Sequence, residues 1–295
     1  MHVRRARPLL GTIVEMTIVG PERSGLDAAA DAAFAAIAKV HRLMSFHAPT
    51  SDVSRLNHAA ADRPVRVHAW TWDVIATAVE LNRRSNGAFD ITVAPLLQTA
   101  GLLPTDGGHA GYATPAPRDA IELLPGQRIR FRHPGTHIDL GGIAKGFAVD
   151  RALGTLRAFS VTTALVNAGG DLAAFGPMAW PVRIRDPRDP RETIGTIEIC
   201  DDALASTGGS FDPFRSPDVA TTAVFDPHVR TPAAAIAGAS VRAPSAMLAD
   251  ALTKIVMIEG EGAAALLAQF GAAALLVARD GDIRVTRSWQ APRAA

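Results

Sequence analysis

The junction at Asp139–Asp150 carries the residues best suited to chemistry in this sequence. A short apolar run enters it, Gly141 and Gly142 stand at the turn, and apolar residues at helical spacing leave it. The unpartnered N–H groups at the start of a helix bind anions, phosphates above all. Lys145 would lie in the first turn, where a cation opposes the helix dipole, so its presence suggests an anion nearby. The alternative is a tight turn with a surface lysine, and a glycine pair does not decide between the two.

A second candidate is Asp250, a carboxylate inside an otherwise apolar helix predicted over Ser245–Ile258. Burying a carboxylate is costly unless a cation or hydrogen-bond donors meet it. A hard cation such as Mg²⁺ takes oxygen ligands, so Asp250 is a candidate metal ligand. The alternative is an ordinary ion pair with Lys254, one helical turn further on. The residues alone leave these two interpretations equal.

Three further segments place glycine together with aspartate, threonine or serine at expected strand ends. They are Gly87–Asp90, Asn167–Asp171 and Ser206–Phe211. Glycine at such ends lets a ligand approach the backbone closely. Each segment alone is more typical of a plain turn, but loops at strand ends commonly carry sites. Together with the junction they favour a binding site.

Other kinds of chemistry are poorly supported. The single cysteine, Cys200, excludes internal disulfides and multi-cysteine metal sites. The sequence has no Gly-x-Ser-x-Gly elbow and no Gly-x-Gly-x-x-Gly fingerprint. A net charge of +1 gives no broad basic field for nucleic acid. No apolar run reaches the ~20 residues of a membrane span, and the basic start has no signal-peptide core. As written, the sequence predicts a cytoplasmic protein without an export signal.

The elements that must position these residues mix antiparallel strands with interposed helices, which indicates an α+β fold. Neither an internal repeat nor a linker divides the 295 residues convincingly. The expected helices nearest the candidate residues cover Leu26–Phe46, Ile143–Phe159 and Ser245–Ile258. The expected strands nearest them cover Leu10–Ile18, Phe89–Val93, His137–Leu140, Thr163–Val166, Leu204–Thr207 and Thr221–Phe225.

Taken in this order, these segments resemble the ApbE family of FAD:protein FMN transferases, from Pro8 to about Val277. Asp139–Asp150 matches the family's most specific motif, and Gly87–Thr92 matches closely. The resemblance implies an α+β fold in one T-fold-like flavin transferase domain, with mixed and antiparallel sheets and flanking helices. That domain would span residues 8–288, between a basic tail at 1–7 and a C-terminal tail at 289–295.

Members of the family cut FAD at its pyrophosphate with Mg²⁺, attach the FMN half to a threonine or serine hydroxyl of another protein, and release AMP. The resemblance therefore implies FAD as substrate, an acceptor flavoprotein as partner and Mg²⁺ as cofactor. It also implies that the protein acts outside the cytoplasmic membrane, as most members of the family do. This differs from the cytoplasmic location that the lack of a signal-peptide core predicts. By motif position, the residues implied to contact FAD are Leu10, His47, Ala88, Phe89, Asp90, Lys145, Gly169, Gly170 and Thr207. The implied metal ligands are the carbonyl of Ala144 and the carboxylate of Asp250, with Thr253 beside them.

The sequence departs from the family pattern at two positions. Lys254 stands where the family has its metal threonine, and the neighbouring Thr253 points about 100° around the helix. Ala223 stands where the family has its candidate base, a histidine. Two hypotheses follow. In the first, the Lys254 ammonium takes the place of Mg²⁺ and makes FAD binding metal-independent. In the second, FMN transfer uses Asp226 or His228 as the base in place of the histidine, or transfer is lost.

Three functions therefore compete. The leading one is a protein flavinyltransferase, favoured by the intact Asp139–Asp150 motif and by Asp250. The others are an FAD-binding relative without transferase activity and a slow FAD pyrophosphatase giving FMN and AMP, both favoured by Ala223 and Lys254. Release of AMP separates a binder from an enzyme, and covalent flavin separates a transferase from a hydrolase.

Overall fold

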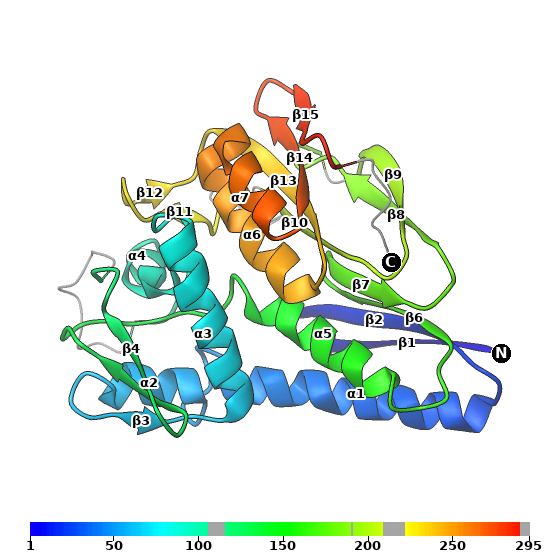
Figure 1. Ribbon diagram of the computed structural model, residues 1–295, viewed down its shortest axis with the longest axis horizontal. Helices are drawn as coiled ribbons and strands as arrows, with labels where there is room; N and C mark the ends of the chain where they lie inside the picture. Colours follow the sequence, from blue (N-terminus) through cyan, green and yellow to red (C-terminus); the bar gives the residue numbers. More distant parts are fainter. Residues whose placement is uncertain (106–115, 190, 209–221, 290–295) are drawn as a thin grey trace. The chain divides into compact units, whose positions relative to one another are not determined.

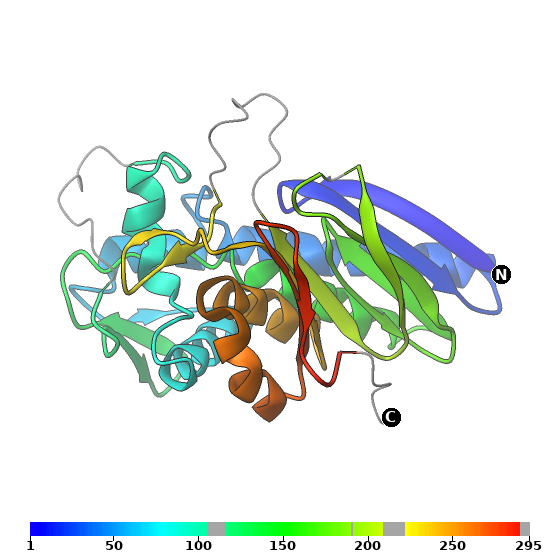
Figure 2. The same ribbon diagram turned by 90° about the horizontal axis from the view of Figure 1, so that it is seen from above.

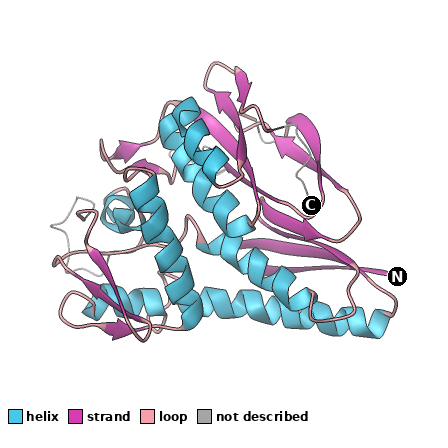
Figure 3. Cartoon of the chain, viewed as in Figure 1, coloured by secondary structure: helices cyan, strands magenta, loops and turns pink. Residues whose placement is uncertain are grey.

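The computed structural model describes residues 1–105, 116–189, 191–208 and 222–289, and its elements are labelled in Figure 1. Two compact units divide the chain. The large unit comprises Met1–His41, Lys145–Ala220 and Ala234–Ala295, and the small unit comprises Arg42–Ala144 and Thr221–Ala233. Both units contain helices and strands (Figure 3), which confirms the predicted α+β class.

The large unit is built on an antiparallel sheet whose strands follow the order β1-β2-β6-β7-β10-β13-β14-β15. Figure 2 shows the blue pair β1–β2 running beside the green strands at one side of this sheet. The strands are β1 (His2–Leu9), β2 (Thr12–Val19), β6 (Thr163–Ala168), β7 (Asp171–Phe175), β10 (Ala203–Gly208), β13 (Ile236–Ala243), β14 (Ala273–Ala278) and β15 (Ile283–Val285).

Helices cover one face of this sheet. Helix α6 (Ala246–Glu259) lies against β7, β10 and β13. Ser245 caps it, and the side-chain oxygen of Ser245 accepts the N–H of Leu248. The other helices of the large unit are α5 (Ala144–Leu156), whose first residue still belongs to the small unit, α7 (Ala264–Gln269) and the first part of α1 (Arg23–Met44), with a 3₁₀ turn η2 (Gly260–Ala263).

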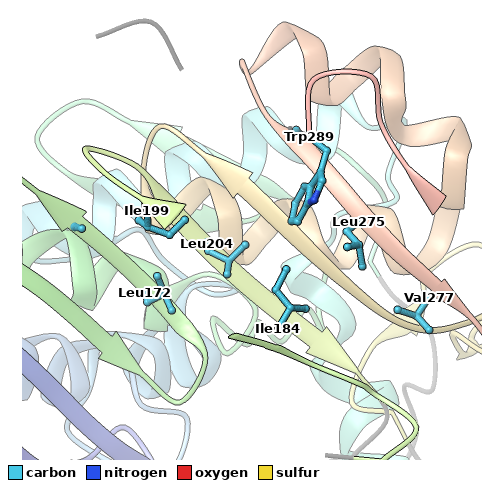
Figure 4. Close-up of a cluster of buried hydrophobic side chains, with 9 residues drawn as sticks. Leu172, Ile184, Ile199, Leu204, Leu275, Val277 and Trp289 are labelled. Atoms are coloured by element: carbon cyan, nitrogen blue, oxygen red, sulfur yellow. The ribbon is translucent and has the colours of Figure 1, made fainter. Parts of the chain in front are cut away.

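The opposite face of the sheet is covered by a two-stranded ribbon, β8 (Trp180–Arg185) and β9 (Thr193–Ile199). Successive side chains of a strand point to opposite faces, so Leu172 and Ala174 of β7 face the ribbon while Ala173 faces the helices. Figure 4 shows the resulting cluster of buried side chains. Its labelled members are Leu172, Ile184, Ile199, Leu204, Leu275, Val277 and Trp289. This core packs the β8–β9 ribbon against β7, β10 and β14 of the sheet.

The small unit combines helices with a three-stranded sheet in the order β3-β5-β4 and a short pair, β11–β12. Leu96, Leu97 and Phe225 form a buried cluster within it. Its elements are the end of α1, α2 (Asp52–Ala59), β3 (Val65–Arg66), α3 (Ala69–Arg84), η1 (Ile91–Val93), α4 (Ala94–Thr99), β4 (Ile121–Leu124), β5 (Arg128–Phe131), β11 (Phe225–Asp226) and β12 (Thr231–Pro232).

The predicted strand over Leu10–Ile18 is wrong at its start. Leu10 and Gly11 both have positive φ, 57° and 71°, which makes them the central residues of a tight turn between two antiparallel strands. The strand β1 precedes this turn, and residues 2–7 of the expected basic tail belong to it. At the other end, Trp289 is buried in the core, and residues 290–295 of the expected C-terminal tail lie outside the described part of the chain.

Two predicted strands near the candidate residues are also wrong. Ile91–Val93 forms a 3₁₀ turn, because the carboxylate of Asp90 accepts the N–H of Thr92 and α4 follows with Pro95 in its first turn. His137–Leu140 joins no sheet of the described residues; its contacts include a bond from the Asp139 N–H to the carbonyl of Ile91 (2.8 Å). Of the predicted strand Thr221–Phe225, residue 221 is not described and only Phe225 lies in a strand.

Among the described residues, the helices are all too short or too polar to cross a lipid bilayer.

Candidate functional site

Four charged side chains of the large unit meet where α5, α6 and the start of β7 come together. They are Lys145, Asp171, Asp250 and Lys254, called here the charge cluster. The Lys145 ammonium is ion-paired with Asp171 and lies 4.0 Å from Asp250. Lys254 is ion-paired with Asp250 from one turn further along α6. The structure therefore brings together the two residues that the sequence singled out first, Lys145 and Asp250.

Asp250 is completely buried, at 0% exposure, yet both of its carboxylate oxygens have donors. The backbone N–H of Gly146, in the first turn of α5, donates to Oδ2 at 3.1 Å. The ammonium of Lys254 donates to Oδ1. Asp250 is therefore the ion-pair partner of Lys254, as the second interpretation predicted, but the pair is buried and does not lie on the helix surface. Its bonds join the first turn of α5 to the middle of α6.

Two threonines complete the surroundings of Lys254. Its ammonium donates to the carbonyl of Asp250 (3.0 Å) and to the hydroxyl of Thr207 at the end of β10 (3.3 Å). The hydroxyl of Thr253 donates to the same carbonyl (2.7 Å) and shares a hydrogen bond with the Thr207 hydroxyl (2.7 Å). A cavity of about 140 Å³ opens beside Thr207, between the ends of β10 and β13 and the β8–β9 ribbon. Residues 209–211 of the Ser206–Phe211 segment lie outside the described residues.

Electrostatics within the cluster keep Lys145 charged. Burial by itself lowers the pKa of Lys145, but the carboxylates of Asp250 and Asp171 together outweigh it and raise that pKa above its usual value. Burial raises the pKa of Asp171 to about 6, and the negative charge of Asp250 adds to the effect. Burial would also raise the pKa of Asp250, but Lys145 and Lys254 outweigh it and lower that pKa. At neutral pH Lys145 is therefore an ammonium group that faces two carboxylates, Asp171 and Asp250.

The glycine-rich turn between β6 and β7 ends at this cluster. Gly169 and Gly170 have positive φ, 68° and 104°, and the N–H of Gly170 donates to the side chain of Asn167 (2.8 Å). A Cβ on Gly169 would collide with Thr12 at the start of β2, so only glycine fits there. Because β2 pairs with β6, Leu10 in the β1–β2 turn lies at this same end of the sheet. The large unit thus gathers Leu10, Gly169, Gly170, Lys145, Thr207, Asp250 and Thr253.

The other implied FAD contacts belong to the small unit. Ala88 and Phe89 are buried, and His47 is exposed. Asp90 accepts the N–H and the hydroxyl of Thr92 (2.7 and 2.8 Å). Burial raises the pKa of Asp90, against the opposing effects of its Thr92 bonds and of the positive charges of Arg118 and His228.

The segment with the candidate bases forms a compact turn in the small unit. Asp226 accepts the backbone N–H of His228 (2.8 Å), and the side chain of His228 is exposed. Ala223, at the position of the family histidine, is exposed as well. Neither candidate base is held by the charge cluster's own elements. The roles of Asp226 and His228 stay predictions.

Sequence reasoning gave no role to two carboxylates of this region. Asp171 is buried at the start of β7, and its place directly after the Gly-Gly pair at an expected strand end was the signal available in the sequence. Asp150 lies on α5 and accepts the N–H groups of Ala246 and Met247 at the start of α6 (2.8 and 2.9 Å). Burial raises the pKa of Asp150 to about 6. It lines a cavity of about 390 Å³ with Phe147 and Met247 among other residues, and its main effect is to fix α5 to α6.

The donor set can be compared with what a divalent cation requires. The described residues contain no group of three or more His, Cys, Asp or Glu side chains able to hold a metal ion. Ala144, whose carbonyl was an implied ligand, is the first residue of α5, directly before Lys145. The oxygens around Asp250 are the Thr207 and Thr253 hydroxyls and the Asp250 carbonyl, and the Lys254 ammonium donates to that carbonyl and to Thr207. A hard cation would have to displace this ammonium.

Comparisons with known proteins agree on one family. The family model described as "ApbE family" matches residues 10–285. A curated FAD:protein FMN transferase of Klebsiella pneumoniae is 25% identical over 96% of this chain and 86% of its own length. One of Vibrio cholerae is 29% identical over 76% of this chain and 71% of its own length.

Solved structures give the same result. The crystal structure of the ApbE protein of Thermotoga maritima covers 98% of both chains, with 25% identity and a TM-score of 0.87. The flavin transferase ApbE of Vibrio cholerae shares the fold with a TM-score of 0.82 at 23% identity, again over 98% of both chains.

Proposed function

The chain belongs to the ApbE family, and we propose that it is an FAD:protein FMN transferase. The hydroxyl oxygen of a threonine or serine on an acceptor protein attacks the phosphorus of the FMN half of FAD. The bond from that phosphorus to the bridging oxygen breaks, AMP leaves with that oxygen, and the hydroxyl proton passes to a base. The products are an acceptor carrying FMN through a phosphoester bond, and AMP.

The observation that carries this proposal is the charge cluster at the first turn of α5. Attack on a diphosphate needs positioning and neutralisation of negative charge more than covalent help from the protein. Lys145, kept charged by Asp250 and Asp171, supplies a fixed cation beside a glycine-rich turn that a phosphate can approach. Thr207 contributes a hydroxyl on the same side.

The proposal assigns the FAD contacts as the family resemblance implies them. In the large unit these are Leu10, Lys145, Gly169, Gly170 and Thr207. In the small unit they are His47, Ala88, Phe89 and Asp90. Asp226 or His228 takes the proton of the acceptor hydroxyl, since Ala223 has no group that could.

A second candidate function is FAD binding or slow FAD hydrolysis without transfer. The observation that favours it is Ala223, which removes the side chain expected to act as base. In hydrolysis, water attacks in place of the acceptor hydroxyl and the products are FMN and AMP.

The test is incubation of the protein with FAD, Mg²⁺ and an acceptor flavoprotein, followed by mass spectrometry of the acceptor and measurement of AMP. We expect one FMN per acceptor and an equal amount of AMP, and no label on an acceptor whose threonine is replaced by valine. AMP without labelled acceptor would identify the hydrolase, and bound FAD without AMP would identify the binder.

A matched pair of variants connects the reaction to the charge cluster. Lys145→Met should lose most of the AMP release, because the fixed cation at the diphosphate is gone. Lys39→Met removes a lysine from α1, outside the proposed site, and should react as the unaltered protein does. Equal activity of the two variants would contradict the role given to Lys145.

A further inference from the structure

We infer that the ammonium of Lys254 takes the place of a divalent cation in this chain, so that FAD binds here without Mg²⁺. The inference rests on the proposed function, because it concerns how the same site neutralises the diphosphate of FAD. Lys254 occupies the position at which the family resemblance places a metal-binding threonine. The structure shows what the lysine does there.

The Lys254 ammonium is bound as a cation would be. It donates to three oxygens: a carboxylate oxygen of Asp250, the backbone carbonyl of Asp250 (3.0 Å) and the hydroxyl of Thr207 (3.3 Å). An ammonium has three N–H donors, so its donors match these three acceptors. The side chain is only 17% exposed. Lys254 is therefore held in the cluster and does not extend into solvent.

The remaining oxygens leave a poor set of ligands for Mg²⁺. This ion needs close to six oxygens at about 2.0–2.1 Å in near-octahedral geometry. Both carboxylate oxygens of Asp250 already accept hydrogen bonds, from Lys254 and from the backbone of Gly146. The Thr253 hydroxyl is committed to the Asp250 carbonyl and to Thr207. Asp171, the other nearby carboxylate, is paired with Lys145.

The charges of the cluster are balanced by protein groups alone. Two carboxylates face two ammonium groups at neutral pH. A threonine at position 254 would leave two carboxylates and one ammonium, a net negative charge that a divalent cation would compensate. With Lys254 present, adding Mg²⁺ would bring two further positive charges against an ammonium that already occupies the Asp250 oxygen. Like charges at such short range, out of water, repel strongly.

A covalently attached cation has a direct consequence for the diphosphate. Lys145 from α5 and Lys254 from α6 keep two positive charges at this place, on helices that are fixed to one another by the Gly146–Asp250 and Asp150–Ala246 bonds. A lysine acts on a phosphate as a compact point charge. A chelator cannot remove such a charge, so EDTA leaves FAD binding intact.

The first experiment is isothermal titration of the unaltered protein with FAD, once in EDTA and once in excess MgCl₂. We expect the two dissociation constants to agree within about twofold. A loss of about tenfold or more in EDTA would overturn the inference and leave the proposed function standing. Absence of FAD binding in both buffers would contradict the proposed function itself, and the inference with it.

The second experiment restores the family's hydroxyl. Lys254→Thr should bind FAD at least about tenfold more weakly in EDTA than in MgCl₂, because a removable cation now supplies the missing charge. The control, Lys39→Thr, makes the same change on α1 and should keep equal affinities in the two buffers. Equal affinities for Lys254→Thr would overturn the inference.

A third measurement is direct binding of a metal ion. Mn²⁺ alone, followed by electron paramagnetic resonance, probes the site without FAD. We expect the Mn²⁺ signal to remain that of the free ion when the unaltered protein is added. Stoichiometric binding that Lys145→Met and Lys254→Met both alter would place a metal at the cluster and overturn the inference.

Discussion

At the scale of single residues, Asp171 and a phosphate compete for the same donors on Lys145, because both are anions. We expect Asp171→Asn to bind FAD more tightly than the unaltered protein. It should also fold less stably by about 1–3 kcal/mol, because a partly buried ammonium loses its charged partner. Titration calorimetry with FAD and urea denaturation measure the two effects.

The control for this variant is Asp189→Asn, which removes a carboxylate paired with the exposed Arg191. It should leave both the stability and the FAD binding close to those of the unaltered protein. Weaker FAD binding by Asp171→Asn would show that the carboxylate orients Lys145 and does not compete with the ligand.

Residue types and spacing predicted part of the site. Lys145 and Asp250 were found because each conflicts with its local setting: a cation at a helix start, and a carboxylate in an apolar helix. The segment ending at Asp171 was named, but its pairing with Lys145 was missed, because the two residues lie on different elements, 26 residues apart, and such a pair has no local pattern. The same holds for the bond between Gly146 and Asp250, which are 104 residues apart.

At the scale of elements, the contact between α5 and α6 is close enough that one glycine decides it. A Cβ on Gly146 would collide with the backbone of Ala246. Gly146→Ala should therefore destabilise the fold by about 1–3 kcal/mol or more, because backbone cannot move aside as a side chain can. Gly154→Ala, in the same helix with open space around it, should stabilise the fold by up to about 1 kcal/mol. Urea denaturation of both variants tests this, and equal stabilities would contradict the close crossing.

Asp150, which joins the same two helices, makes stability depend on pH. Its pKa is raised to about 6 in the folded chain, so between its unfolded value of about 3.9 and 6 the folded state binds more protons than the unfolded state. The contribution of Asp150 to the free energy of unfolding is therefore most favourable below pH 4 and is lost as the pH rises towards 6. Each factor of ten in proton affinity is about 1.4 kcal/mol, so the loss is at most about 3 kcal/mol.

Asp150→Asn isolates this effect, since other titrating groups are common to both proteins. We subtract the free energy of unfolding of the unaltered protein from that of the variant. This difference should rise by about 2–3 kcal/mol from pH 4 to pH 7.5, because only the unaltered protein loses stability as Asp150 ionises. Urea denaturation at both pH values measures it. A difference that stays constant with pH would show that the carboxyl titrates normally.

Helices longer than ten residues were predicted well, and short segments were not. The helices expected over Leu26–Phe46 and Ser245–Ile258 correspond to α1 and α6, because an apolar face repeats over several turns. Ile91–Val93 is β-branched at each position and was expected in a strand, but the Asp90 cap and the following helix make it a 3₁₀ turn. In so short a segment, one side-chain hydrogen bond outweighs propensity.

At the scale of the whole molecule, a ligand that binds only the folded chain raises its stability by mass action. At 100 times its dissociation constant, FAD should add about 2.7 kcal/mol to the free energy of unfolding. Riboflavin, which has the same ring system without phosphates, should add much less at equal concentration, because the charge cluster recognises the diphosphate. Thermal melting with each compound measures the difference. Equal shifts would place the recognition at the flavin ring alone.

The position of Cys200 gives the molecule a natural attachment point. It is the only thiol in the chain, it is exposed, and it follows β9 on the side of the sheet that carries the ribbon, with Sγ 3.4 Å from the carbonyl of Gly176. A maleimide dye would therefore label every molecule once and at the same place, without mutagenesis. Paired with the fluorescence of bound flavin as the energy donor or acceptor, that single label would report arrival and departure of FAD in real time.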